Sequence, residues 1–218
     1  MSPATTVNVA APQLEFDVEG VEPLEYAAVP TLAFRVRVDA GKAAVRSLAL
    51  NVQLRIESQR RPYDADERGR LFELFGPSGN WSRTLRSLRW TTASLTVPAF
   101  EGATTVEVPV PCTYDFDVVA SKYLDALGGG SVPLTLLFSG TVFFTAAGGN
   151  LQVVHLPWDR EAQCALPVQV WREALEQAFP GTAWVRVRRD LFERLQAYKN
   201  ERALLTWDAT LEELLPDD

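Results

Sequence analysis

The feature that most constrains the fold of this chain is a strict alternation of apolar and polar side chains in short segments. In the clearest of them, residues 48–56, every even-numbered position from Leu48 to Ile56 carries Leu, Val or Ile. A period of two residues places these side chains on one face of a β-strand. A slip of one residue would expose all of them, so the pattern predicts a half-buried strand with a fixed register.

Comparable segments recur along the first three quarters of the chain and predict further strands. They cover residues 14–19, 31–38, 90–97, 104–110, 112–118, 132–145, 151–158 and 160–166. Turn residues separate them: we expect the chain to reverse at residues 40–42 (Ala-Gly-Lys), and residues 146–150, which contain two glycines and an asparagine, predict a hairpin.

Helical signals occur in three places. Asp64 precedes Glu67 by three residues, a capping-box pattern that predicts a helix ending near Phe75. Residues 119–127 predict a short helix. After Pro167 the apolar residues recur at helical spacing, which predicts helices at 168–179, from Asp190 and from Thr206.

Strands first and helices last indicate an α+β fold. We predict a predominantly antiparallel β-sandwich of immunoglobulin-like flavour, with a helical insert and a C-terminal helical segment. The expected organisation is a loose N-terminal lead (1–12), a β-sandwich core (13–166) with an arginine-rich insert at about 59–90, and an α-rich segment (167–218) packed on the core.

The formal net charge of −7 argues against a nucleic-acid partner, because phosphate binding needs a surplus of Lys and Arg. The sequence contains no run of eighteen apolar residues, so we predict no membrane insertion. The N-terminal residues lack the basic region and following apolar stretch of a secretory signal. We therefore expect a cytoplasmic protein. Its oligomeric state does not follow from the sequence.

Few side chains in this sequence are suited to chemistry. Alternation places Cys112 and Cys164 on apolar strand faces, where thiols are usually inert, and neither belongs to a CxxC motif. His155 is the one histidine. We predict no catalytic residue, no metal ligand and no cofactor, and leave open an enzyme that uses His155 with Asp115 or Asp159.

The insert carries a local charge opposite to that of the chain. The segment from Arg55 to Arg89 contains eight arginines and five acidic residues, which gives it a net charge of +3. Trp and Arg are enriched at interface hot spots. The sequence therefore predicts an exposed partner-binding patch, although solvated or locally paired arginines are an open alternative. Its candidate residues are Trp81, Arg83, Arg86, Arg89 and Trp90.

Five stretches resemble one uncharacterised family of unknown function found mainly in actinobacteria. They are residues 85–90 (LRSLRW), 108–115 (VPVPCTYD), 138–143 (FSGTVF), 166–168 with Trp171, and 206–209 (TWDA). Genes of that family often lie beside those for nickel-iron hydrogenases and their maturation proteins. The resemblance spans nearly the whole chain from Leu14, implies an association with hydrogenase assembly, and transfers no catalytic residue.

These observations favour a non-catalytic accessory protein that binds another protein, such as a hydrogenase subunit or maturation factor, through the insert. A sandwich that binds a small ligand or carbohydrate with exposed aromatic side chains is a second hypothesis. The enzyme using His155 is the third.

Overall fold

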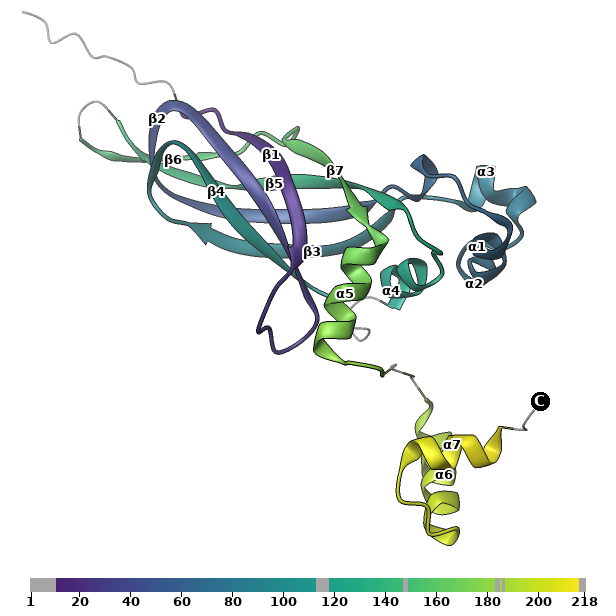
Figure 1. The fold of residues 1–218 in the computed structure, drawn as a ribbon. Helices are drawn as coiled ribbons and strands as arrows, with labels where there is room; N and C mark the ends of the chain where they lie inside the picture. The colour runs from purple at the N-terminus through teal and green to yellow at the C-terminus, as the bar shows by residue number, and fades with distance from the viewer. Residues whose placement is uncertain (1–10, 113–117, 147–148, 183–184, 186, 216–218) are drawn as a thin grey trace, which may run out of the picture. The chain divides into compact units, whose positions relative to one another are not determined.

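A computed structural model describes residues 11–112, 118–146, 149–182, 185 and 187–215. Seven antiparallel strands form one hydrogen-bonded sheet that folds over itself into a sandwich-like arrangement (Figure 1). The strands are β1 (Glu15–Pro23), β2 (Thr31–Ile56), β3 (Leu88–Val97), β4 (Phe100–Pro111), β5 (Ser131–Thr145), β6 (Leu151–His155) and β7 (Glu161–Pro167). The predominantly antiparallel sandwich with helices is therefore confirmed, as a single continuous sheet.

The long strand β2 connects the two layers. Its first part, up to Val45, pairs with β1 on one side and β4 on the other. Its second part, which overlaps the first at Val45, pairs with β3 and β5. Strands β6 and β7 extend the second layer because each pairs with one half of β5.

The expected reversal at residues 40–42 is wrong. These residues lie within β2, where the register against β4 shifts between Asp39 and Ala44. Gly41 adopts a positive φ of 61°, and its N–H donates to the Asp39 carboxylate at 2.8 Å. A glycine and an aspartate that resemble a turn form a bulge here, because the following residues pair again with the same neighbouring strand.

The core lies between the two layers. The alternating residues of β2 from Leu48 to Ile56 are buried, as predicted. Phe16 of β1 stacks on Phe138 of β5 with ring centroids 4.2 Å apart. Gly140 permits close approach of β5 to β2, since a Cβ there would lie 2.1 Å from the Ala49 carbonyl oxygen.

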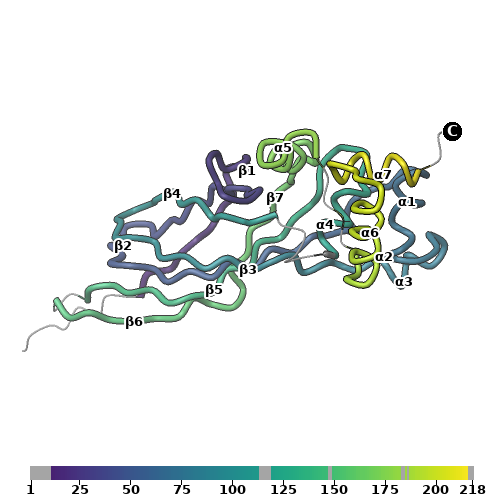
Figure 2. Tube along the Cα trace, turned by 90° about the horizontal axis from the view of Figure 1, so that it is seen from below, coloured from purple at the N-terminus to yellow at the C-terminus, as the bar shows by residue number. Residues whose placement is uncertain are grey.

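The helices lie in the insert and in the second half of the chain. They are α1 (Ala65–Arg70), α2 (Phe72–Phe75), α3 (Trp81–Thr84), α4 (Val118–Asp125), α5 (Val168–Ala178), α6 (Arg189–Glu201) and α7 (Trp207–Leu214), with short 3-10 turns at Ser58–Arg60 and Ser78–Asn80. Helix α5 buries Val168, Trp171 and Ala174 and lies beside β1 and β7 (Figure 2).

Two of the predicted caps are confirmed and one is wrong. Asp64 and Glu67 form the reciprocal capping box, and Thr206 accepts the Ala209 N–H at 3.1 Å. Asp190 does not cap α6, which begins at Arg189; it lies in the first turn instead, where a carboxylate suits the helix dipole. The strand expected at 112–118 lies mostly outside the described residues, and Val118 begins α4.

The chain divides into two compact units, Met1–Gly181 and Thr182–Asp218. The first contains the sheet, the insert and α5, and we call it the sheet unit. The second contains α6 and α7, and we call it the hairpin unit. The boundary at residue 167 stays a prediction.

Candidate protein-binding surface

The predicted arginine-rich insert, at about residues 59–90, comprises most of the segment between β2 and β3 and the first residues of β3. Its two arms are tied together near the sheet. Ser58 Oγ donates to the Arg86 carbonyl at 2.7 Å, and Gln59 Nε2 donates to the Leu85 carbonyl at 2.6 Å. Ser87 Oγ donates to the buried Glu57 carboxylate at 2.5 Å. Side chains thus continue the pairing of β2 and β3 beyond the last strand residues.

An aromatic cluster holds the far end of the insert. Trp81 and Tyr63 pack edge to face with centroids 5.2 Å apart, and Phe75 packs against both Trp81 and Tyr123. The Tyr63 and Tyr123 hydroxyls are 2.6 Å apart, and burial raises the pKa of both. Tyr123 belongs to α4, so the cluster joins the insert to the segment that precedes β5.

A buried carboxylate makes a second connection to the same segment. Glu67 of α1 accepts from Arg61 Nη2 at 2.7 Å and from the Gly128 N–H at 2.9 Å. Arg61 Nη2 also donates to the Gly129 carbonyl at 3.0 Å. Arg70 Nε donates to the Ala126 carbonyl at 2.7 Å. The insert is therefore fixed against the turn that enters β5.

The remaining arginines of this region point to solvent. Five are exposed and form no ion pair in the part of the chain that the structure describes: Arg60, Arg68, Arg83, Arg86 and Arg89. Arg83 lies in α3, Arg86 in the following loop, and Arg89 at the start of β3, where it reaches Thr92 Oγ1 at 3.4 Å. Three of the predicted binding residues are thus available to a partner.

The two tryptophans of the predicted patch are less exposed than we expected. Trp90 is only 6% exposed and packs edge to face on Phe34, with centroids 6.4 Å apart, so it is a core residue and not part of an exposed patch. Its position in the period of β3 points it between the layers. Trp81 is half-buried, and its Nε1 donates to the Gly76 carbonyl at 3.0 Å.

The candidate residues for chemistry do not converge in the described part of the chain. His155 is exposed on β6, and its Nδ1 lies 3.2 Å from Thr141 Oγ1. Asp159 approaches Arg160 at 3.9 Å, and Asp115 lies outside the described residues. No group of three or more His, Cys, Asp or Glu side chains suited to a metal ion occurs among those residues.

Both cysteines are free thiols in apolar surroundings. Cys112 is buried, and its Sγ donates to the Val110 carbonyl at 3.4 Å; Cys164 is half-buried. Burial raises the pKa of each thiol to about 12. Since the thiolate is the reactive form, the raised pKa keeps both cysteines in the less reactive thiol form at neutral pH.

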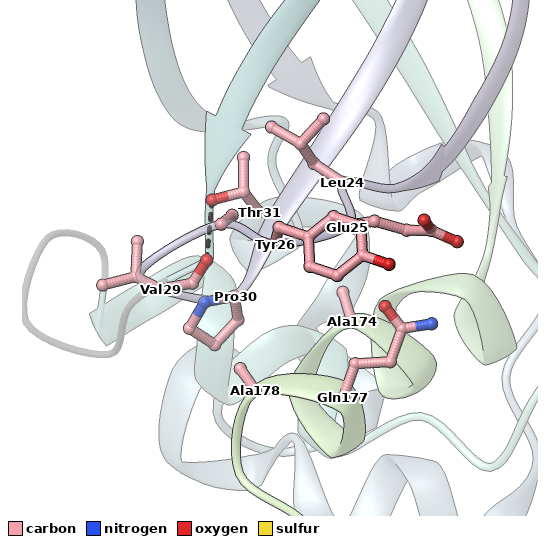
Figure 3. A pocket seen from close by; sticks show the side chains of 10 residues that line it. Leu24, Glu25, Tyr26, Val29, Pro30, Thr31, Ala174, Gln177 and Ala178 are labelled. Carbon is pink, nitrogen blue, oxygen red and sulfur yellow. Dashed lines mark hydrogen bonds between the residues drawn. The ribbon is translucent and has the colours of Figure 1, made fainter.

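The sequence reasoning missed an exposed groove between the β1–β2 loop and α5. Tyr26 is fully exposed and adopts a φ of 58°, which is rare for a bulky residue. Its ring and the Gln177 amide line the same groove of about 390 Å³, together with Glu25 (Figure 3). The local sequence indicates only that residues 24–29, between Pro23 and Pro30, form a loop; it does not indicate a groove.

The family model described as "Family of unknown function (DUF6084)" matches residues 11–218. The chain belongs to DUF6084. The expectation of an uncharacterised family is confirmed. No curated protein matches the chain.

Solved structures similar to this DUF6084 member share little sequence with it. A late embryogenesis abundant (LEA) protein is 15% identical with a TM-score of 0.34, over 72% of this chain and 71% of that one. A β-glucosidase from Kluyveromyces marxianus is 11% identical with a TM-score of 0.26, and the match covers 73% of this chain but 15% of the enzyme. Among the described residues, no helix combines the length and apolarity needed to cross a membrane.

Proposed function

We propose that this DUF6084 member is a non-catalytic, cytoplasmic accessory protein that binds another protein through the exposed arginines of its insert. The observation that carries the proposal is the contrast within the insert between anchored and free guanidinium groups. Arg61 and Arg70 are used to fix the insert, whereas Arg83, Arg86 and Arg89 extend into solvent from it.

A fixed insert favours binding because its residues lose little conformational freedom when a partner docks. Guanidinium groups without an intramolecular ion pair suit carboxylates, which they bind in bidentate geometry. The chain carries a net charge of −7, so a local basic surface also orients an acidic partner during approach. The partner we infer is therefore a protein with an acidic surface.

The resemblance described above supports a subunit or maturation intermediate of a nickel-iron hydrogenase as that partner. Affinity capture from the native host under hydrogenase-expressing conditions tests this choice, with mass spectrometry as the readout. Recovery of hydrogenase components is the expected result. Their absence, with other proteins recovered through the same arginines, would leave the surface correct and the partner wrong.

The surface itself is tested by replacing Arg83, Arg86 and Arg89 with alanine. If each exposed charge contributes about 0.5 kcal/mol to the binding free energy, removal of all three is expected to weaken binding roughly tenfold. The matched control replaces Arg35, Arg37 and Arg46 of β2, which are also exposed arginines. Equal loss of capture in both triple variants would mean that overall charge, and not the insert, determines binding.

The groove at Tyr26 favours a second candidate function, binding of a small ligand or carbohydrate. A strained backbone conformation persists only where the surrounding structure enforces it, and such residues are enriched at ligand sites. An exposed aromatic ring beside a carboxylate and an amide offers a stacking face and hydrogen bonds, which suits a sugar. Titration calorimetry with glucose oligosaccharides tests it, with Tyr26→Ala expected to abolish any heat of binding.

A further inference from the structure

The hairpin unit lacks an interior of its own. Three contacts join its two helices. Arg202 forms an ion pair with Glu213 at 2.6 Å, and Tyr198 Oη donates to the Glu213 carboxylate at 3.2 Å. The ring centroids of Phe192 and Trp207 are 5.3 Å apart. Among its described residues, Thr210 is the one that is buried. Helices of 13 and 8 residues are too short to be stable in water without packing.

The apolar side chains of this unit are arranged for packing that the unit does not supply. On α7, Trp207, Leu211 and Leu214 follow the spacing i, i+4, i+7 of one helix face. Nine large apolar residues among the described residues of this unit are between 36% and 92% exposed: Val185, Val187, Leu191, Phe192, Leu205, Trp207, Leu211, Leu214 and Leu215.

This exposed surface is large enough for a stable interface. With a whole large apolar side chain taken as on the order of 150–200 Å², the exposed fractions of these nine residues amount to roughly 700–1,000 Å². Each partner in a standard protein interface contributes about 800 Å². One further helical hairpin laid across α6 and α7 would therefore bury the surface.

The charges of the two helices favour a second copy of this chain as that hairpin. Between Arg188 and Arg202, five basic residues outnumber three acidic ones, whereas α7 carries three acidic residues and no basic one. Arg189 and Arg194 of α6, and Asp208 and Glu212 of α7, form no ion pair within the described residues. A two-fold axis would place α6 of each copy against α7 of the other, so that opposite charges meet.

We propose that two copies of this chain associate through their hairpin units, with α6 and α7 of both copies forming a four-helix bundle. Such bundles bury one apolar face of each helix in a common core. The inference is independent of the function of the insert, because it uses no residue of the sheet unit.

Analytical ultracentrifugation of the full chain tests the proposal. The wild-type chain is expected to sediment with twice the 24.2 kDa mass of one chain. Leu211→Glu is expected to raise the dissociation constant at least about tenfold, since it places a charge in the bundle core. The control, Leu151→Glu, makes the same change at an exposed leucine of β6 and should leave the mass unchanged.

A charge swap adds a readout that altered folding does not imitate. Glu212→Arg alone is expected to weaken the dimer severalfold, and adding Arg194→Glu is expected to restore it. A wild-type chain that stays at 24.2 kDa up to about 100 μM would overturn the proposal, whether the hairpin is then covered by another part of the chain or by a different protein. A dimer broken by Leu151→Glu and not by Leu211→Glu would overturn it equally.

Discussion

The sheet unit and the hairpin unit use the same kinds of residues with opposite results. In the sheet unit, leucines and aromatic residues from strands distant in sequence meet between two layers and are buried. In the hairpin unit, leucines at regular helical spacing stay exposed because two short helices provide one layer only. An apolar periodic pattern therefore predicts which face of an element is apolar. Whether that face is buried depends on a second layer that packs against it.

The largest expected effect is the loss of stability when a buried ion pair is broken, compared with the loss when an exposed ion pair is broken. Arg61–Glu67 and Arg202–Glu213 are 2.7 and 2.6 Å long, but their side chains are 9% and 3% exposed in the first pair against 58% and 33% in the second. Glu67→Ala leaves a guanidinium buried without its partner and is expected to destabilise the sheet unit by about 4 kcal/mol. Glu213→Ala is expected to cost less than about 1 kcal/mol. Urea denaturation measures both, and similar values would remove the contrast.

Truncating an apolar side chain should show the same contrast with a somewhat smaller effect. Leu50→Ala opens a cavity between the layers and is expected to lower the free energy of unfolding by about 3 kcal/mol. Leu211→Ala, measured below the concentration at which chains associate, is expected to change it by less than about 0.5 kcal/mol. Tryptophan fluorescence during chemical denaturation gives both values. A large loss for Leu211→Ala would show that the hairpin is already covered within one chain.

Alkaline pH should weaken the sheet unit through its buried thiol. Burial raises the Cys112 pKa from about 9 to about 12, so the folded state holds the proton more tightly than the unfolded state. This contribution is fully present below pH 9 and is lost as the pH rises toward 12. By pH 10.5 the loss amounts to about 2 kcal/mol.

The pH dependence can be assigned with one variant. Cys112→Ala should make the fall in stability above pH 9 shallower without removing it, because burial also raises the pKa of Cys164 and of Tyr63. Unfolding curves collected at several pH values measure the slope. An unchanged slope in the variant would show that Cys112 does not contribute to this pH dependence.

The smallest expected effect is a gain in the hairpin unit. Ala203 follows α6 with a φ of 52°; its N–H donates to Asn200 at 3.1 Å, and the Leu204 N–H donates to Lys199 at 3.0 Å. This is the Schellman arrangement, in which glycine is preferred at the left-handed position. Ala203→Gly is expected to stabilise the hairpin by about 0.5–1 kcal/mol, seen as slower amide exchange in α6. Slower exchange in the sheet unit as well would indicate that the units unfold together.

Local patterns predicted the elements better than their connections. The period of two identified the strand at 48–56, and the capping box identified the start of α1. The continuity of β2 through residues 40–44 was not predictable, because Asp39 and Gly41 suit a turn and a bulge equally well. Pairing of Ala44 and Val45 with β4 distinguishes them, and that pairing lies outside the local sequence.

The candidate surface was predicted in part for the same reason. The exposed positions of Arg83, Arg86 and Arg89 follow from their charge, which is costly to bury. Trp90 was misassigned because its neighbours are arginines, while its environment is set by Phe34, which lies far away in the sequence. The buried contact of Arg61 and Glu67 with Gly128 and Gly129 was missed, since no pattern links residues more than sixty positions apart.

The sequence by itself determined which segments form strands and helices, where the capping box lies and where charge concentrates, because each depends on residues within a few positions of one another. The tertiary structure alone decided which arginines fix the insert and which stay free, and which apolar faces are buried. Those outcomes depend on contacts between distant segments, whose energies arise only when the layers come together.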